Sequence, residues 1–280
     1  MKSLKQILKY YDIGGFTCYD LGYITKNREK PHIAVNYHGV HIYLLNALYS
    51  ITNDRVLYDY YKLWKAYVDT TEVDRISGVN RYETNANISK EFTKEGINTI
   101  ILASGENYAD ALSAVPLASK NKWPILLAES NSIDSFTINE IKRLNPNKII
   151  VIGGEGAISQ KVCNDIKKIN KSIVFERIGG KDRYETNTKV LNRFIDELDL
   201  SKVYVAIGGP SNMDYADLLS CAPLAAISKS PILLVPTTRQ IPKSLTDFAY
   251  DNLENNTNII AIGGKAILPN YKINSIVPEK

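Results

Sequence analysis

Short apolar runs and helical patterns alternate along the chain from residue 82 onward. The apolar runs are NTIILA (98–103), PILLA (124–128), KIIVIGG (148–154) and SIVFE (172–176). Apolar residues recur every three to four positions, which is typical of helices, at 82–95, 107–120, 133–144 and 156–169. Apolar runs without polar alternation indicate strands that are covered on both faces. Because such strands alternate with helices, we predict an α/β fold with a parallel sheet and right-handed crossovers.

The same order of elements returns in the second half of the chain. RISGVNRYETN (75–85) returns as RIGGKDRYETN (177–187), and NYADALSAVPLAS (107–119) returns as DYADLLSCAPLAA (214–226). The separation of equivalent residues grows from 102 to 110, as loop insertions within two equivalent units of roughly 100 residues would produce. We therefore predict two tandem doubly wound parallel-sheet repeats of the Rossmann/Toprim-like kind, at residues 71–174 and 175–280.

The first 70 residues follow a different pattern and form a predicted segment of their own, 1–70. HGVHIYLLNALYSI is a strong helical pattern, and DRVLYDYYKLWKAYV places Leu57, Tyr60 and Trp64 at helical spacing. Eleven of the 18 tyrosines and all three histidines lie in this segment. We predict a short all-α segment that contains two packed helices.

Composition and charge exclude several classes of protein. The chain has 280 residues, of which 44% are apolar, and this is enough for a substantial core. Residues 71–280 hold 25 of the 34 basic and 24 of the 30 acidic side chains, so no basic field of the kind that binds nucleic acid is present. The cysteines, Cys18, Cys163 and Cys221, show no metal-binding or disulfide spacing.

No membrane segment or secretion signal is expected. The sequence contains no run of about 18 apolar residues, which a membrane-spanning helix needs. Its start, MKSLKQILKYYDIGG, has basic residues but lacks the apolar stretch of a signal peptide. We expect no transmembrane segment, and a product that is not exported as written.

The repeated eleven residues predict the start of a helix. Asn80 and Asp182 are good N-caps, and Glu83 and Glu185 stand at the position from which a side chain reaches back to the cap. The cap residues are therefore interpreted as scaffold. A cap does not need arginines at matching positions, so the arginines are candidates for ion pairing or ligand binding: Arg75, Arg81, Arg177 and Arg183.

Each repeat also places one carboxylate, Asp110 or Asp217, in an otherwise apolar helix start. A carboxylate among alanine and leucine is costly unless it is paired. We predict that an arginine of the same repeat pairs with each aspartate and stabilises the structure. A catalytic role is disfavoured because no second carboxylate, histidine or cysteine recurs at matching positions to share acid–base work.

The glycine pairs that follow the strands do not form a nucleotide-binding motif. VIGGEGAIS falls one residue short of the dinucleotide fingerprint, and AIGGKAILP loses it altogether. We interpret both as tight strand-to-helix turns, and we expect no cofactor. Such turns point helix N-termini and free amides outward, where phosphate or carboxylate groups bind.

The ordered motifs R-x-x-G-x-x-R-Y-E-T, N-Y-A-D-A-L-S-A-x-P-L-A, P-I-L-L and V-I-G-G resemble the cell wall-binding repeat 2 module of clostridial-type surface-layer and wall proteins. The resemblance covers residues 75 to about 277. It implies a non-catalytic anchor that binds an anionic, phosphate-containing wall polysaccharide at the cell surface. It also associates the ILL triplets with polymer attachment, whereas the residues themselves predict buried strand: Ile125, Leu126, Leu127, Ile232, Leu233 and Leu234.

The chain departs from that family in the number of repeats. The family commonly carries three repeats that pack around one another, and this chain has two. NSIVPEK, the equivalent of KSIVFERIGG, ends where a third RIGG would begin. We expect either weakened polymer binding or a homo-oligomer that restores the contact through the surface left free.

The first 70 residues resemble the C-terminal end of D-glucuronyl C5-epimerases, on the motifs Y-D-x-G…Y-D-L, Y-H-x-x-H and W-K-x-Y. The resemblance implies that Tyr19 and Tyr37 match catalytic tyrosines. Most of that enzyme is missing, so we expect vestigial tyrosines, a truncated reading frame and no activity. The rival interpretation is an active epimerase completed by a separately encoded part. His32, His38 and His41 lack a further ligand, so no metal site is expected.

Overall fold

The computed structural model of the chain describes residues 1–26, 29–34, 36–68, 76–209 and 215–276. It divides into two compact units, Met1–Arg75 and Ile76–Lys280. Arg75, one of the candidate arginines, lies outside the described residues.

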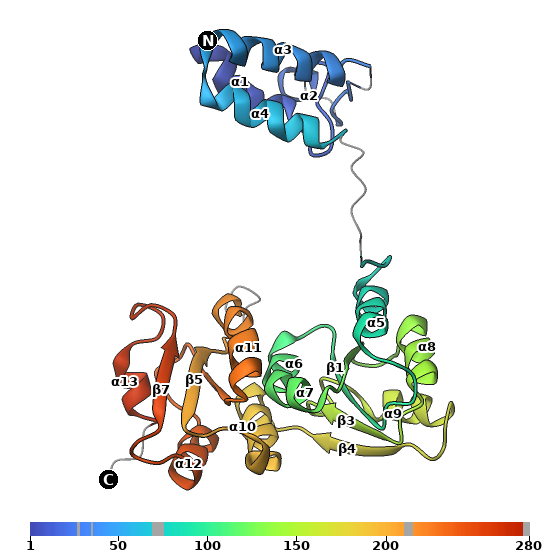
Figure 1. Ribbon diagram of the computed structural model, residues 1–280, viewed down its shortest axis with the longest axis vertical. Helices are drawn as coiled ribbons and strands as arrows, with labels where there is room; N and C mark the ends of the chain where they lie inside the picture. Colours follow the sequence, from blue (N-terminus) through green and yellow to red (C-terminus); the bar gives the residue numbers. More distant parts are fainter. Residues whose placement is uncertain (27–28, 35, 69–75, 210–214, 277–280) are drawn as a thin grey trace. The chain divides into compact units, whose positions relative to one another are not determined.

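The first unit is helical (Figure 1). Its helices are α1 (Lys2–Tyr11), α2 (Gly22–Thr25), α3 (His38–Thr52) and α4 (Arg55–Ala66). Asn53 adopts a left-handed conformation that ends α3, and the Asp54 carboxylate caps α4 by accepting from the Val56 N–H at 3.0 Å. Leu45 of α3 packs against Leu57 and Trp64 of α4. The two predicted helices are confirmed.

The second unit contains two parallel sheets, one in each repeat (Figure 1). The first has the order β2-β1-β3-β4 and the second the order β6-β5-β7. The strands are β1 (Thr99–Ser104), β2 (Ile125–Ala128), β3 (Lys148–Ile152), β4 (Val174–Ile178), β5 (Lys202–Ile207), β6 (Ile232–Val235) and β7 (Asn258–Ile262). The predicted α/β repeats with parallel sheets are confirmed.

Helices cover these sheets. They are α5 (Arg81–Phe92), α6 (Tyr108–Ser113), α7 (Val115–Asn121), α8 (Ser135–Leu144), α9 (Gln160–Lys167), α10 (Arg183–Arg193), α11 (Ala216–Ser228), α12 (Lys243–Asn252) and α13 (Asn270–Asn274), with a short 3₁₀ turn at Ile195–Glu197. The single helix expected over 107–120 is broken at Ala114, with Pro116 in the first turn of α7. None of the helices in the described ranges has the length and apolarity to cross a bilayer.

An apolar core joins the two repeats. Val190 and Phe194 of α10 are buried with Leu117 and Ala118 of α7. Leu112 of α6 is buried against residues of α11 in a neighbouring cluster. Strand β4 completes the first sheet and leads directly into α10 of the second repeat, so it crosses the boundary predicted at 174/175.

Candidate functional site

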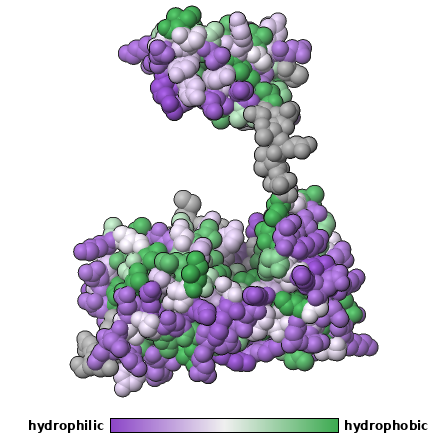
Figure 2. All heavy atoms as spheres, viewed as in Figure 1, coloured by the Kyte–Doolittle hydropathy of each residue, from purple (hydrophilic) through white to green (hydrophobic). Residues whose placement is uncertain are grey.

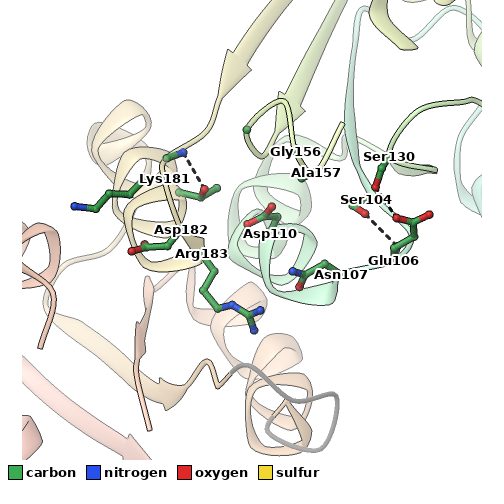
Figure 3. Close-up of a pocket in the computed structure, with 13 residues that line it drawn as sticks. Ser104, Glu106, Asn107, Asp110, Ser130, Gly156, Ala157, Lys181, Asp182 and Arg183 are labelled. Atoms are coloured by element: carbon green, nitrogen blue, oxygen red, sulfur yellow. Dashed lines mark hydrogen bonds between the residues drawn. The ribbon is translucent and has the colours of Figure 1, made fainter. Parts of the chain in front are cut away.

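A cleft of about 500 Å³ opens at the carboxyl ends of the strands of the first sheet. In the order β2-β1-β3-β4, the connections from the central strands β1 and β3 run in opposite directions, and the crevice at such a switch point is where open α/β sheets bind ligands. Both repeats line it: Ser104, Glu106, Asn107, Asp110, Ser130, Gly154, Gly156 and Ala157 from the first, and Gly180, Lys181, Asp182, Arg183 and Thr186 from the second. We call this space the inter-repeat cleft (Figure 3).

Asp110 lies in this cleft with a side chain that is almost fully buried. It belongs to the first turn of α6 and is 6% exposed. A Cβ at residue 153 would lie 2.7 Å from Asp110 Oδ2, and Gly153 has φ +115°. Glycine after β3 therefore makes room for the carboxylate and permits the backbone conformation. Gly263 stands in the same relation to Asp217, at 2.8 Å and φ +121°.

The charge that acts on Asp110 does not come from an arginine of the same repeat, as the sequence predicted. Burial raises the pKa of Asp110 to about 6, while the charge of Arg183 acts in the opposite direction. Arg183 belongs to the second repeat, so the acting charge comes from across the inter-repeat cleft. Within the described ranges neither Asp110 nor Asp217 forms an ion pair with a lysine or arginine. An arginine partner for Asp217 stays a prediction.

The three candidate arginines that the structure describes each donate a hydrogen bond to a backbone carbonyl just after the end of a strand. Arg81 Nη1 donates to the Gly105 carbonyl at 2.5 Å, and Arg183 Nη1 donates to the Gly209 carbonyl. Arg177 Nη1 donates to the Gly153 carbonyl at 3.0 Å. Of these three, Arg183 lines the inter-repeat cleft. Polymer contact by any of them stays a prediction.

The repeated motif forms the capped helix starts that its sequence predicts. Asn80 Oδ1 accepts from the N–H groups of Tyr82 and Glu83 at 3.0 and 2.9 Å. Asp182 Oδ1 accepts from the Glu185 N–H at 2.8 Å. The glutamate of each copy reaches back to the residue before the cap, as Glu185 does to the Lys181 N–H at 3.0 Å.

The last residue of each RYETN holds the ILL strand, a role that the sequence did not reveal. Asn187 Nδ2 donates to the Ile232 carbonyl at 2.9 Å, and its Oδ1 accepts from the Leu234 N–H at 3.1 Å. Asn85 makes the same two bonds to Ile125 and Leu127, at 2.9 and 3.1 Å. The side-chain amide thus forms with the edge strand the two hydrogen bonds that a neighbouring strand would form. The asparagine recurs in both copies of the motif, and this repetition was the signal in the sequence that could have revealed its role.

The ILL triplets form β2 and β6. Leu126 is buried in the core of the first repeat, and Ile232, Leu233 and Leu234 are buried in that of the second, whereas Ile125 and Leu127 are partly buried. None of the six lines the inter-repeat cleft. These residues are placed to stabilise the two sheets. Their role in polymer attachment stays a prediction.

The candidate catalytic tyrosines of the first unit lie together. The rings of Tyr19 and Tyr37 meet edge to face with centroids 5.1 Å apart. The centroid of the His32 ring lies 5.2 Å from that of Tyr19. Both tyrosine side chains are about half exposed. Catalysis by this pair stays a prediction.

The other histidines take part in the packing of the first unit. The Thr17 N–H donates to His38 Nδ1 at 3.2 Å, so His38 Nε2 carries the proton and donates to the Trp64 carbonyl at 3.0 Å. Thr17 Oγ1 also lies 2.8 Å from His41 Nδ1. In the described part of the chain, no three histidine, cysteine or carboxylate side chains are grouped to hold a metal ion.

Two families match the chain. Residues 75–163 and 177–273 match the family described as cell wall binding domain 2 (CWB2). Residues 1–66 match the family described as D-glucuronyl C5-epimerase C-terminus.

Individual relatives agree with these matches. N-acetylmuramoyl-L-alanine amidase LytC of Bacillus subtilis is 31% identical over 204 residues, which are 73% of this chain and 38% of that protein. The D-glucuronyl C5-epimerase of Caenorhabditis elegans is 37% identical over 67 residues, 24% of this chain and 11% of that enzyme. The structure of Cwp6 from Clostridium difficile superposes with a TM-score of 0.65 and 32% identity, over 75% of this chain and 33% of Cwp6. The chain thus spans about a third of LytC and of Cwp6.

Proposed function

This chain belongs to the cell wall binding domain 2 family, and on that premise we propose that it attaches without covalent bonds to an anionic, phosphate-containing wall polysaccharide. Its place of action is the cell wall or cell surface. The working boundaries are 1–70 for the epimerase-like segment, 71–174 for the first repeat and 175–280 for the second. The two alternatives that the sequence left open, weakened polymer binding or a homo-oligomer, both belong to this proposal.

The inter-repeat cleft is the observation that carries the proposal. Arg183 stands at the start of α10, where its charge and the positive end of the helix dipole favour a phosphate group. Glu106 and Asp182 line the same cleft and are acceptors for sugar hydroxyls. A sugar phosphate needs both kinds of group, so the mixed charges of the cleft suit it better than they suit a bare anion.

Sedimentation with purified walls tests the attachment. The chain is expected to sediment with walls at low salt and to be released as salt rises, because counterions screen its contacts with phosphate. Walls stripped of their anionic polymer serve as the control. Failure to bind polymer-bearing walls at low salt would contradict the proposal.

Asp110→Asn is expected to change the pH dependence of stability. Because burial raises the pKa of Asp110 to about 6 from 3.8, the folded chain binds a proton that the unfolded chain has released, and stability is lost as the pH rises through this window. Asparagine has no proton to release. As the pH rises from 4 to 7, the free energy of unfolding of the variant is therefore expected to rise relative to that of the parent by up to about 3 kcal/mol. Urea unfolding at several pH values measures the difference.

The same substitution bears on polymer binding. An ionised Asp110 repels an anionic polymer, so the parent is expected to bind walls more tightly at pH 5 than at pH 7, and the variant is expected to lose most of this difference. Equal pH profiles for parent and variant, in both unfolding and binding, would show that Asp110 does not titrate in this range.

The second candidate function is uronosyl C5-epimerisation by the first unit, and the pairing of Tyr19 with Tyr37 favours it. The match covers 11% of the C. elegans enzyme, so catalysis requires a part supplied from elsewhere. Solvent deuterium at C5 of a uronic-acid polymer measures the activity. We expect none from this chain alone, and incorporation by the purified chain would establish an enzyme.

A further inference from the structure

Asp110 differs from the other acidic side chains of the inter-repeat cleft because it has no hydrogen-bond partner among the described residues. Glu106 is exposed, and its Oε2 accepts from Ser130 Oγ at 2.5 Å. Asp182 is exposed as well, and its Oδ1 accepts from the Glu185 N–H at 2.8 Å. Asp110 is only 6% exposed, yet it forms neither a hydrogen bond nor an ion pair with any residue that the structure describes. The cleft therefore contains a buried carboxyl group whose polar atoms are left for a ligand.

Arg183 lines the cleft from the other repeat and keeps unused donors. Figure 3 shows the Asp110 side chain between the start of α10, which carries Arg183, and the pair formed by Glu106 and Ser130. Nη1 of Arg183 donates to the Gly209 carbonyl. Among the described residues Arg183 makes no other hydrogen bond, and a guanidinium has five N–H donors. Arg183 and Asp110 thus border a space in which their remaining polar groups have no protein partner.

The surface of the second unit offers no substitute for these groups in holding an anion. Figure 2 shows hydrophilic and hydrophobic residues interspersed over the visible face of this unit. Residues 71–280 hold 25 basic and 24 acidic side chains, so their charges nearly cancel. Individual groups of the cleft, rather than a broad field of positive charge, therefore have to hold a phosphate.

The neutral acid is the form of Asp110 that suits an anionic ligand. A buried carboxylate without a hydrogen-bond donor is costly, and a phosphate beside it adds a second negative charge. The protonated carboxyl group has an O–H to donate and carries no charge. The other charged residues that line the cleft are Glu106, Lys181, Asp182 and Arg183, and the charge of Arg183 favours the carboxylate. A phosphate bound by Arg183 offsets that charge, so the occupied site favours the acid.

We propose that Asp110 binds the phosphate directly: as the neutral acid it donates its O–H to one oxygen of a phosphate diester, while Arg183 donates to another. This inference rests on the proposed function and assigns a further residue that contacts the phosphate. A diester carries one negative charge and no O–H, so it accepts from both groups and has no proton to give. Where Asp110 is ionised beforehand, its carboxylate takes up one proton from the solvent as the diester binds.

Calorimetric titration of the full chain with glycerophosphoglycerol, a soluble phosphate diester, tests this role. Titrations at pH 6.5 in two buffers of different ionisation enthalpy count the protons that binding takes up. Burial raises the pKa of Asp110 to about 6, so most of the free carboxyl group is ionised at that pH. The parent is expected to take up roughly half a proton or more for each diester bound.

The other results of this titration overturn the proposal. An ionised Asp110 that accepts from sugar hydroxyls would release protons on binding, and a phosphate bound elsewhere would move none. A chain that sediments with walls but does not bind the diester would also contradict the role of Asp110. A chain that does not sediment with walls at low salt contradicts the proposed function itself, so the two failures are distinguished.

Asp110→Asn and Asp110→Ala separate the hydrogen bond from the charge. Asparagine is uncharged and keeps an N–H donor, so this variant is expected to bind the diester without proton uptake, and more tightly than the parent at pH 7. Alanine is uncharged and has no donor, so it is expected to bind roughly tenfold or more weakly than Asp110→Asn at pH 5 and at pH 7.

Asp217→Ala, at the equivalent position outside the cleft, is the matched control and is expected to bind and to take up protons as the parent does. The unfolding midpoint of each variant is measured alongside, and the proton count of the parent needs no variant. Equal binding by the two Asp110 variants would show that Asp110 acts through its charge alone and donates no hydrogen bond.

Discussion

Asn187→Ala is expected to lower the free energy of unfolding of the second unit by about 3 kcal/mol or more. The side chain is fully buried and bonds to Ile232 and Leu234 of β6, and its Nδ2 also lies 3.1 Å from Ser113 Oγ in the first repeat. Alanine leaves these groups without their partner, and each unsatisfied buried group costs roughly 1–3 kcal/mol. Urea unfolding followed by circular dichroism measures the loss.

Asn85→Ala is the matched control for this prediction. Asn85 makes the same two bonds to β2, but it is partly exposed, so water can replace part of what is lost. The expected loss is about half that of Asn187→Ala. A loss below about 1 kcal/mol for Asn187→Ala would show that the amide does not hold the ILL strand.

Arg183→Gln is expected to weaken binding to purified walls by roughly tenfold or more at low salt, as loss of a charge-assisted contact to phosphate implies. Arg183 is the arginine that lines the inter-repeat cleft, and it is partly buried at the start of α10. A partly buried cation loses less of its effect to solvent screening than an exposed one.

Two further variants control for charge and for folding. Lys243→Gln removes one positive charge from an 86% exposed side chain on α12, outside the cleft, and is expected to bind walls within about twofold of the parent. Arg183→Lys keeps the charge and is expected to retain part of the binding. Since Arg183 also holds the Gly209 carbonyl, the unfolding midpoint of each variant is measured alongside. Equal binding by Arg183→Gln and Lys243→Gln would show that Arg183 does not take part in polymer binding.

The features that the sequence predicted depend on short stretches of chain. The strand NTIILA and the helix that Asn80 begins need residues within a few positions of one another, and a period or a cap reveals them. The repeated motifs likewise showed that the second sheet copies the first. The family resemblance then implied wall binding, which no local pattern could show.

The site depended on packing that no local pattern contains. Asp110 and Arg183 are 73 residues apart in the sequence and line the same cleft because α6 packs on α11 and α7 packs on α10. Gly153 was interpreted as a turn, but its second role, leaving room for the Asp110 carboxylate, needs the position of α6. No local pattern showed the bonds that Asn187 makes, because they need β6 beside the helix. Each of these contacts joins elements that the sequence separates.

Hydrogen exchange with and without purified wall polymer tests most directly whether the inter-repeat cleft is the binding site. Polymer is expected to slow exchange in peptides that cover 104–110, 154–157 and 180–186, which line the cleft. Peptides from α12, which line no part of it, are expected to exchange at the same rate in both samples. Protection confined to the first unit, or spread evenly over the second, would contradict a site between the repeats.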